Sequence, residues 1–314
     1  MPDAFRDRLS RGAPLLLDAA MGTELSRRGG GAAPPLWSAG ALLARPDLVR
    51  EIHEENVAAG AEILTANTFR THGRNLKQGL DPLFLEGKKG TAAELSAVAV
   101  RLAREAVALT LSKKSAAGRA APPAASGEIP AREGPSYLSK KIFVAGSLSP
   151  LEDCYRPDLV PPDPELSAEH RAQAEALAAA GVDLLLVETM NSIRELVSAT
   201  SAAVSTGLPV VASMVTDGGG CLLSGEAIAE AAHALSSLQR KPAALGINCV
   251  PARKLGADLA RLAAAAPGVP LAAYGNTGRA LDESRGLFSE PIEPAEYAAI
   301  AREWIRLGAR VVGG

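Results

Sequence analysis

Eight short apolar runs recur along the chain, and most of the segments between them show helical spacing of their apolar residues. The runs are almost continuously apolar rather than alternating, which is typical of parallel strands covered on both faces. We predict strands at Leu15–Asp18, Ile63–Asn67, Ile142–Ser147, Asp183–Glu188, Val210–Val215, Ala243–Asn248, Leu271–Tyr274 and Arg310–Val312. Alternating strand and helix units indicate an α/β fold.

Three of these strands have a glycine two or three positions before their first residue, at Gly60, Gly181 and Gly308. A glycine just after a helix adopts a left-handed backbone without steric cost, so the chain can turn at once into a strand. The first strand is not followed by a G-x-G-x-x-G phosphate-binding turn, which disfavours a doubly wound sheet. We therefore predict a single (β/α)8 TIM barrel spanning residues 1–314.

One segment, residues 112–140, does not fit the barrel pattern. It contains lysine pairs, Pro122-Pro123, glycine and serine, with little apolar periodicity. Such a composition buries too little apolar surface to form part of a core. We predict a flexible surface insertion before the third strand, and not a domain boundary.

Composition and charge narrow the classes of partner. The formal net charge is −2 with no long basic block, which disfavours nucleic acid and anionic membranes as partners. No apolar run approaches the roughly 18 residues that span a bilayer, and the charged N-terminus lacks the apolar core of a signal peptide. We expect a cytoplasmic protein that acts on small molecules, and a homo-oligomer is compatible with this composition.

The carboxyl ends of the predicted strands are unusually polar, and in a barrel these ends form the active site. Each polar residue has a structural alternative, since a lone Asp often caps a helix and a buried Cys often only packs. Two carboxylates, two amides and a thiol on one rim are better explained by a binding site. These residues are Asp18, Glu188, Asn248, Asn276 and Cys249.

The same segments carry a family resemblance. The motifs are Asp18-Ala-Ala-Met-Gly-Thr23, Leu36-Trp37-Ser38, Thr65-Ala-Asn-Thr-Phe69, Gly146-Ser-Leu-Ser-Pro150, Glu188-Thr189, Gly246-Ile-Asn-Cys249 and the terminal Gly313-Gly314. In this order the chain, from about Leu15 to Gly314 without the insertion, resembles the homocysteine S-methyltransferase family. That family includes betaine-, S-methylmethionine- and methylfolate-dependent enzymes.

The resemblance implies transfer of a methyl group from a small donor to the thiol of homocysteine, giving methionine. Because only the thiolate is a good nucleophile, the family binds Zn2+ through three cysteines and leaves the fourth position to the substrate sulfur. Cys249 matches the first zinc ligand, and metal activation is the only catalysis that we predict.

The resemblance also assigns substrate contacts. Asp18 and Glu188 match the acidic pair for the amino group of homocysteine, and backbone N–H groups from Ala19 to Thr23 suit its carboxylate. Asn67, Asn248 and Asn276 complete the predicted substrate-binding set. On the donor side, the aromatic face of Trp37 would attract a cationic methyl group by about 0.5–2 kcal/mol, or the side chain is a hydrophobic plug.

Two departures from the family pattern affect this prediction. Ala19 stands where the family usually has Gly, so its methyl group reshapes the carboxylate pocket. The Cys-Cys pair that follows Gly-Gly in the family does not follow Gly314 here, so we expect zinc to be lost or weakly bound by the 314-residue chain. The explanations are truncation, which we favour, a true loss of zinc, or a rebuilt site that uses Cys154 and Cys221.

Two other functions stay open at this point. One is a metal-free barrel that binds an amino acid or serves as an accessory subunit. The other is a different barrel enzyme, such as a lyase with Glu188 as general base. No lysine lies at a predicted strand end, which argues against a Schiff-base aldolase.

Overall fold

A computed structural model describes residues 3–30, 35–79, 91–120, 141–282, 287–289 and 292–314. Its centre is an eight-stranded parallel sheet in the order β1-β10-β7-β6-β5-β4-β3-β2. The strands are β1 (Leu15–Leu16), β2 (Ile63–Ala66), β3 (Phe143–Leu148), β4 (Leu184–Met190), β5 (Val210–Met214), β6 (Ala244–Pro251), β7 (Leu271–Asn276) and β10 (Ala309–Gly313). A parallel bridge joins Leu17 after β1 to Ile63 in β2, and the Asp18 N–H donates to the Ile63 carbonyl at 3.0 Å. The sheet therefore closes, which confirms the predicted TIM barrel.

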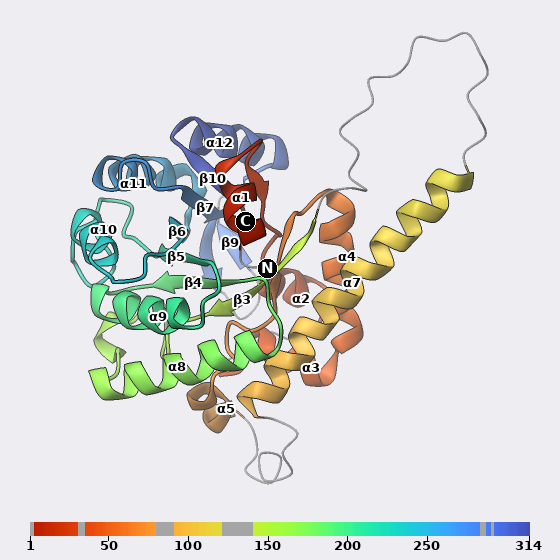
Figure 1. Cartoon of the computed structure of the whole chain (residues 1–314), viewed down its shortest axis with the longest axis horizontal. Helices are drawn as coiled ribbons and strands as arrows, with labels where there is room; N and C mark the ends of the chain where they lie inside the picture. The colour runs from red at the N-terminus through yellow and green to blue at the C-terminus, as the bar shows by residue number, and fades with distance from the viewer. Residues whose placement is uncertain (1–2, 31–34, 80–90, 121–140, 283–286, 290–291) are drawn as a thin grey trace.

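Helices surround the strands in Figure 1. Those between successive strands are α2 (Met21–Arg27), α3 (Ala41–Ala44), α4 (Pro46–Ala59), α5 (Gly73–Gly79), α7 (Ala92–Ala120), α8 (Asp163–Ala179), α9 (Ile193–Ser205), α10 (Ile228–Ser236), α11 (Ala252–Ala265) and α12 (Pro294–Arg306). Short 3-10 turns occupy Ser38–Gly40 and Pro157–Leu159. Gly60, Gly181 and Gly308 have φ angles of 109°, 85° and 103°, so the predicted left-handed turns into β2, β4 and β10 are confirmed.

The amino-terminal end of the barrel interior is filled by apolar side chains and closed by α1 (Asp3–Ser10). Phe5 of α1 is buried and packs edge-on against Phe143 at the start of β3, with ring centroids 5.3 Å apart. Arg310 of β10 donates to the Leu9 carbonyl at 3.0 Å, which fixes the end of this helix. At the opposite end of the barrel, where the strands have their carboxyl ends, the interior contains polar side chains such as Ser147 and Glu188.

The structure differs from the predicted elements at several places. Helix α7 continues to Ala120, so the beginning of the predicted insertion is helical, and residues 121–140 lie outside the described residues. A two-stranded antiparallel hairpin, β8 (Arg279–Asp282) with β9 (Leu287–Ser289), follows β7. Strands β4 and β6 also extend beyond their predicted ends at Glu188 and Asn248.

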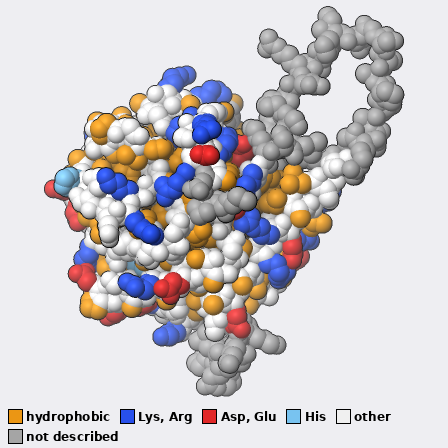
Figure 2. All heavy atoms as spheres, in the orientation of Figure 1, with side chains coloured by type: hydrophobic (Ala, Val, Ile, Leu, Met, Phe, Trp, Pro, Cys, Tyr) orange, Lys and Arg blue, Asp and Glu red, His pale blue; other side chains and the backbone are white. Residues whose placement is uncertain are grey.

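Charged side chains of both signs are scattered over the face shown in Figure 2, among apolar and uncharged groups. None of the described helices is long and apolar enough to cross a membrane. The cytoplasmic location and the homo-oligomer stay predictions from the sequence.

Candidate active site

A cavity of about 560 Å³ opens at the carboxyl ends of the strands. Every site residue predicted from the sequence lines it, namely Asp18, Ala19, Thr23, Trp37, Asn67, Glu188, Asn248, Cys249 and Asn276. These residues come from the ends of five different strands or the segments that follow them. Closure of the barrel therefore brings together groups that lie up to 258 positions apart, from Asp18 to Asn276.

The floor of the cavity is a polar layer within the barrel. Along several strands the inward-facing residue changes from apolar to polar at the last inward position, as in Phe143-Ala145-Ser147 and Leu184-Leu186-Glu188. The period of two in side-chain direction explains why this layer is hidden within runs that look uniformly apolar. The polar members that line the cavity are Thr65, Ser147, Glu188 and Tyr274.

Asp18 directs its carboxylate toward β2. Oδ2 accepts a hydrogen bond from the Thr65 N–H at 2.8 Å, and Oδ1 accepts one from Thr65 Oγ1 at 2.8 Å. Burial raises the pKa of Asp18 from 3.8 to about 7; the hydrogen bonds from Thr65 oppose this change, and the charge of Glu188 adds to it. The carboxyl group therefore holds a proton more readily than an exposed aspartate does.

Glu188 lies across the barrel on β4 and is equally buried, with 8% of its surface exposed. Its Oε1 accepts a short hydrogen bond from Ser147 Oγ on β3. Burial raises the pKa of Glu188, while the hydrogen bond from Ser147 and the nearby Tyr274 hydroxyl oppose this rise. Since two buried carboxylates of like charge repel, the pair is suited to a cationic ligand that compensates both.

The sulfur of Cys249 also faces this cavity and is held by two donors. Asn248 Nδ2 and Thr189 Oγ1 each lie 3.4 Å from Cys249 Sγ. Asn248 Nδ2 also donates to Thr189 Oγ1 at 2.8 Å, and its Oδ1 accepts from the Thr189 N–H at 2.9 Å. The amide of Asn248 is thus used to join β4 to β6 and to orient the sulfur.

Strained backbone is concentrated at this cavity. Among the described residues, the non-glycine residues with left-handed backbone are Trp37, Thr189 and Cys249, with φ angles of 51°, 61° and 56°. All three line the cavity. Such conformations cost on the order of 1–3 kcal/mol each and persist only where the surroundings determine them. The hydrogen bonds of Asn248 hold Thr189 and Cys249 in these conformations.

Trp37 lines the cavity, and Asn67 holds the neighbouring residue, Ser38. Ser38 Oγ donates to Asn67 Oδ1 at 2.6 Å, and Asn67 Nδ2 donates to the Ser38 carbonyl at 2.8 Å. A Cβ atom added at Gly22 would lie 2.9 Å from Trp37 Nε1, so only glycine fits beneath the indole ring. Asn67 therefore fixes the loop that carries Trp37.

The remaining predicted contacts lie at the exposed rim. Ala19 and Thr23 are exposed, and the Ala19 N–H donates to Asn56 Oδ1 at 3.3 Å. Asn276, at the end of β7, is partly exposed toward the cavity. The backbone of Ala19 is thus already partnered, which leaves the groups nearer Thr23 and the side chain of Asn276 for a ligand.

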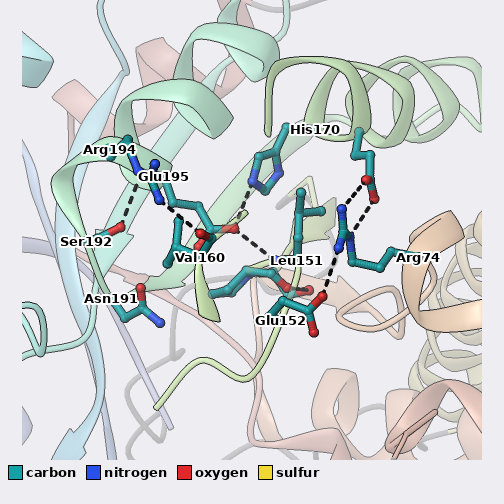
Figure 3. A network of polar contacts seen from close by, with 12 residues as sticks. Arg74, Leu151, Glu152, Val160, His170, Asn191, Ser192, Arg194 and Glu195 are labelled. Carbon is teal, nitrogen blue, oxygen red and sulfur yellow. Dashed lines mark hydrogen bonds and ion pairs between the residues drawn. The ribbon is translucent and has the colours of Figure 1, made fainter. Parts of the chain in front are cut away.

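The loop after β3 is anchored by a buried network, shown in Figure 3. Glu195 Oε1 accepts from the Leu151 N–H at 2.8 Å and lies 3.2 Å from His170 Nε2. Arg74 pairs with Glu152 at 3.0 Å on the other side of this loop. These contacts fix the loop that follows β3. They thereby help to hold Ser147, which donates to Glu188.

Tyr297 of α12 joins the ends of the two strands beside Cys249. Its oxygen lies 2.8 Å from the Gly275 carbonyl and 2.6 Å from the Gly313 carbonyl, which share its single O–H as acceptors, and it accepts from the Gly275 N–H at 3.1 Å. Burial raises the pKa of Tyr297 to about 12, so the hydroxyl stays protonated. It thus fixes β10 against β7 at the cavity rim.

A zinc ion needs three or four protein ligands, and Cys249 alone does not fit that requirement. Among the residues that the structure describes, no group of three or more His, Cys, Asp or Glu side chains is arranged to hold a metal. Cys154 and Cys221 do not line the cavity. The hypothesis of a rebuilt zinc site from these two cysteines is therefore wrong for the described residues.

The comparisons with known proteins agree with this geometry. A family model described as Homocysteine S-methyltransferase matches residues 15–314. The chain belongs to this family. Homocysteine S-methyltransferase of Escherichia coli is 31% identical over 311 residues, which cover 96% of this chain and 90% of the relative. Betaine-homocysteine S-methyltransferase of Drosophila melanogaster is 28% identical over 293 residues, which cover 89% of this chain and 82% of that relative.

Solved structures show the same likeness. The metallated form of the homocysteine methyltransferase MmuM from Escherichia coli matches with a TM-score of 0.75 at 28% identity, covering 99% of this chain and 94% of that one. The carboxyl transferase domain of Rhizobium etli pyruvate carboxylase, at 10% identity and a TM-score of 0.53, shares the fold alone. The predicted homocysteine S-methyltransferase type of enzyme is confirmed.

Among the polar residues that line the cavity, Thr65, Ser147, Thr189 and Tyr274 were not predicted as site residues. Ser147 lies within β3 and is fully buried against Glu188. Thr65, Ser147 and Tyr274 could have been found from their spacing. Each lies two positions after an apolar inward-facing residue on the same strand, so its side chain points to the same side. Thr189 gives no such signal, because its left-handed backbone interrupts the alternation.

Proposed function

We propose that this enzyme transfers a methyl group from a small donor to the sulfur of homocysteine, giving methionine. The observation that supports it most is the buried pair Asp18 and Glu188 in one cavity with the Cys249 sulfur. An α-ammonium group placed between the two carboxylates would offset the cost of burying their charges. The proposed reaction is the one for which the chain's family is named.

The proposed roles follow from the contacts of each side chain. Asp18 and Glu188 bind the substrate ammonium, and Thr65 and Ser147 orient the two carboxylates. The substrate thiolate then attacks the methyl carbon in line, so that a sulfur–carbon bond forms while the bond from that carbon to the donor breaks. Trp37, which lines the cavity, would contact the donor. No covalent intermediate with the enzyme is required.

We also propose that Cys249 is one ligand of a zinc ion. Among the described cysteines only Cys249 lines the cavity, so a polypeptide of residues 1–314 by itself should bind zinc weakly, because the free energy of such a site comes from all its ligands. In the family the other two cysteines follow Gly-Gly after the last strand. Two cysteines added after Gly314 would follow β10, which Tyr297 fixes beside the cavity.

A second function is favoured by the same single thiolate: an amino-acid-binding barrel without methyl transfer. The two functions share the carboxylate pair and differ in turnover. Binding of homocysteine without product, in protein supplied with zinc and a panel of methyl donors, would support this second function.

Calorimetry with homocysteine and with 4-mercaptobutanoate, which lacks only the amino group, tests the substrate assignment. We expect homocysteine to bind at least about tenfold more tightly, because a lost charged hydrogen bond costs about 1.5–3 kcal/mol. Equal affinities would show that the carboxylates do not bind the ammonium group. Absence of homocysteine binding would contradict the proposed function itself.

A further inference from the structure

Tyr274 is the last inward-facing residue of β7, and its side chain lines the same cavity as Asp18 and Glu188. It is 92% buried, since 8% of its surface is exposed. Among the described residues its hydroxyl has no hydrogen bond of acceptable geometry, although Glu188 and Ser213 face it. Buried polar groups nearly always have partners, so an unpartnered hydroxyl at a cavity wall indicates a missing ligand atom.

The position of Tyr274 around the barrel complements the two carboxylates. In the order of the closed sheet, β1, β4 and β7 are the first, fourth and seventh strands. Asp18, Glu188 and Tyr274 therefore approach the cavity from three sides. An ammonium group has three N–H donors directed to three sides, as in lysine. Two carboxylates satisfy two of these donors and leave one.

We propose that the hydroxyl oxygen of Tyr274 accepts the third hydrogen bond of the substrate ammonium, while its own O–H donates to Glu188. This inference deepens the proposed function and rests on it. A tyrosine suits the position because it is neutral. Burial, reinforced by the charge of Glu188, raises the pKa of Tyr274 well above its ordinary value, so the hydroxyl keeps its proton.

A neutral acceptor has an electrostatic advantage at this position. Asp18 and Glu188 already repel each other, and a third carboxylate would raise the cost of the empty pocket further. The tyrosine adds an acceptor without adding charge. It also couples to Glu188 through its donor, so one hydroxyl would bind the substrate and hold the carboxylate that binds it.

The experiment compares Tyr274→Phe with the unchanged protein, by calorimetry with homocysteine and with methionine. Both ligands carry the same ammonium group, so we expect Tyr274→Phe to lower both affinities by the same factor, about tenfold. The midpoint temperature of thermal unfolding of the ligand-free variant should be unchanged or slightly higher, because the substitution removes an unpartnered buried hydroxyl.

Ser213→Ala is the matched control. The Ser213 hydroxyl is also buried without a partner among the described residues, but it does not line the cavity. We expect its removal to leave both affinities unchanged. Unchanged affinities in Tyr274→Phe, an effect on homocysteine alone, or an equal loss in Ser213→Ala would overturn the proposal. If the unchanged protein bound neither amino acid, the proposed function would fail as well.

Discussion

Replacing Asp18 with Asn should stabilise the ligand-free protein at neutral and alkaline pH while removing its affinity for homocysteine. The structure buries the Asp18 carboxyl group and raises its pKa from 3.8 to about 7. Asn resembles the protonated carboxyl group in shape and cannot ionise. Its amide can still pair with the Thr65 N–H and Thr65 Oγ1, which are the two partners of the native side chain.

The sign of this effect follows from the raised pKa. Below about pH 4 the carboxyl group is protonated in both the folded and the unfolded chain, so Asp18 has no pH-dependent effect on stability. Between about pH 4 and pH 7 the unfolded chain ionises first, and the folded chain loses stability relative to it. Above pH 7 the loss is constant, and at 1.36 kcal/mol per pKa unit it amounts to about 4 kcal/mol.

Urea denaturation between pH 4.5 and pH 8 measures this difference. The free energy of unfolding of Asp18→Asn should exceed that of the unchanged protein by about 4 kcal/mol at pH 8, and the gap should close as the pH falls. Asp47→Asn, at an exposed position in the first turn of α4, is the control for removing one carboxylate. A gap that does not depend on pH, or a less stable Asp18→Asn at pH 8, would refute the reasoning.

Three further predictions follow from the same site. Glu188→Gln should weaken homocysteine binding in calorimetry by about 1–3 kcal/mol while the protein still folds; unchanged affinity would assign the residue a purely structural role. Homocysteine affinity should rise with pH up to about pH 7 and then level off, because the ammonium binds the ionised form of Asp18; an affinity that falls across this interval would contradict the assignment. Replacing residues 121–140 with a Gly-Ser linker should leave the midpoint of thermal unfolding unchanged, and a large fall would place the segment in the core.

Much of the fold could be predicted because parallel barrel strands have a strong sequence signal. Each of the eight apolar runs overlaps an observed strand, and the glycine at position 60 takes the expected left-handed backbone. The extension of α7 to Ala120 was missed, because the sequence of its last turns contains lysines, serine and glycine and shows no apolar period. Local composition does not reveal how far a helix continues past its packed part.

The site was predicted as a set of residues but not as a set of contacts. Asn67 and Asn248 line the cavity as expected, yet their amides bind Ser38 and Thr189, and pairing across loops or between strands cannot be read from a single sequence. Tyr274 was recognised only as a strand end. Its role becomes visible once closure of the barrel places β7 opposite Glu188.

The most direct test of the account is whether this barrel forms methionine from homocysteine. The assay uses the chain extended by two cysteines and a short tail after Gly314, supplied with zinc and a panel of methyl donors, with methionine detected by mass spectrometry. We predict near-stoichiometric zinc and methionine formation with at least one donor, and loss of both in Cys249→Ser of the extended protein. The same rate of methionine formation in Cys249→Ser, or no methionine from any donor in protein that holds zinc and binds homocysteine, would contradict the account.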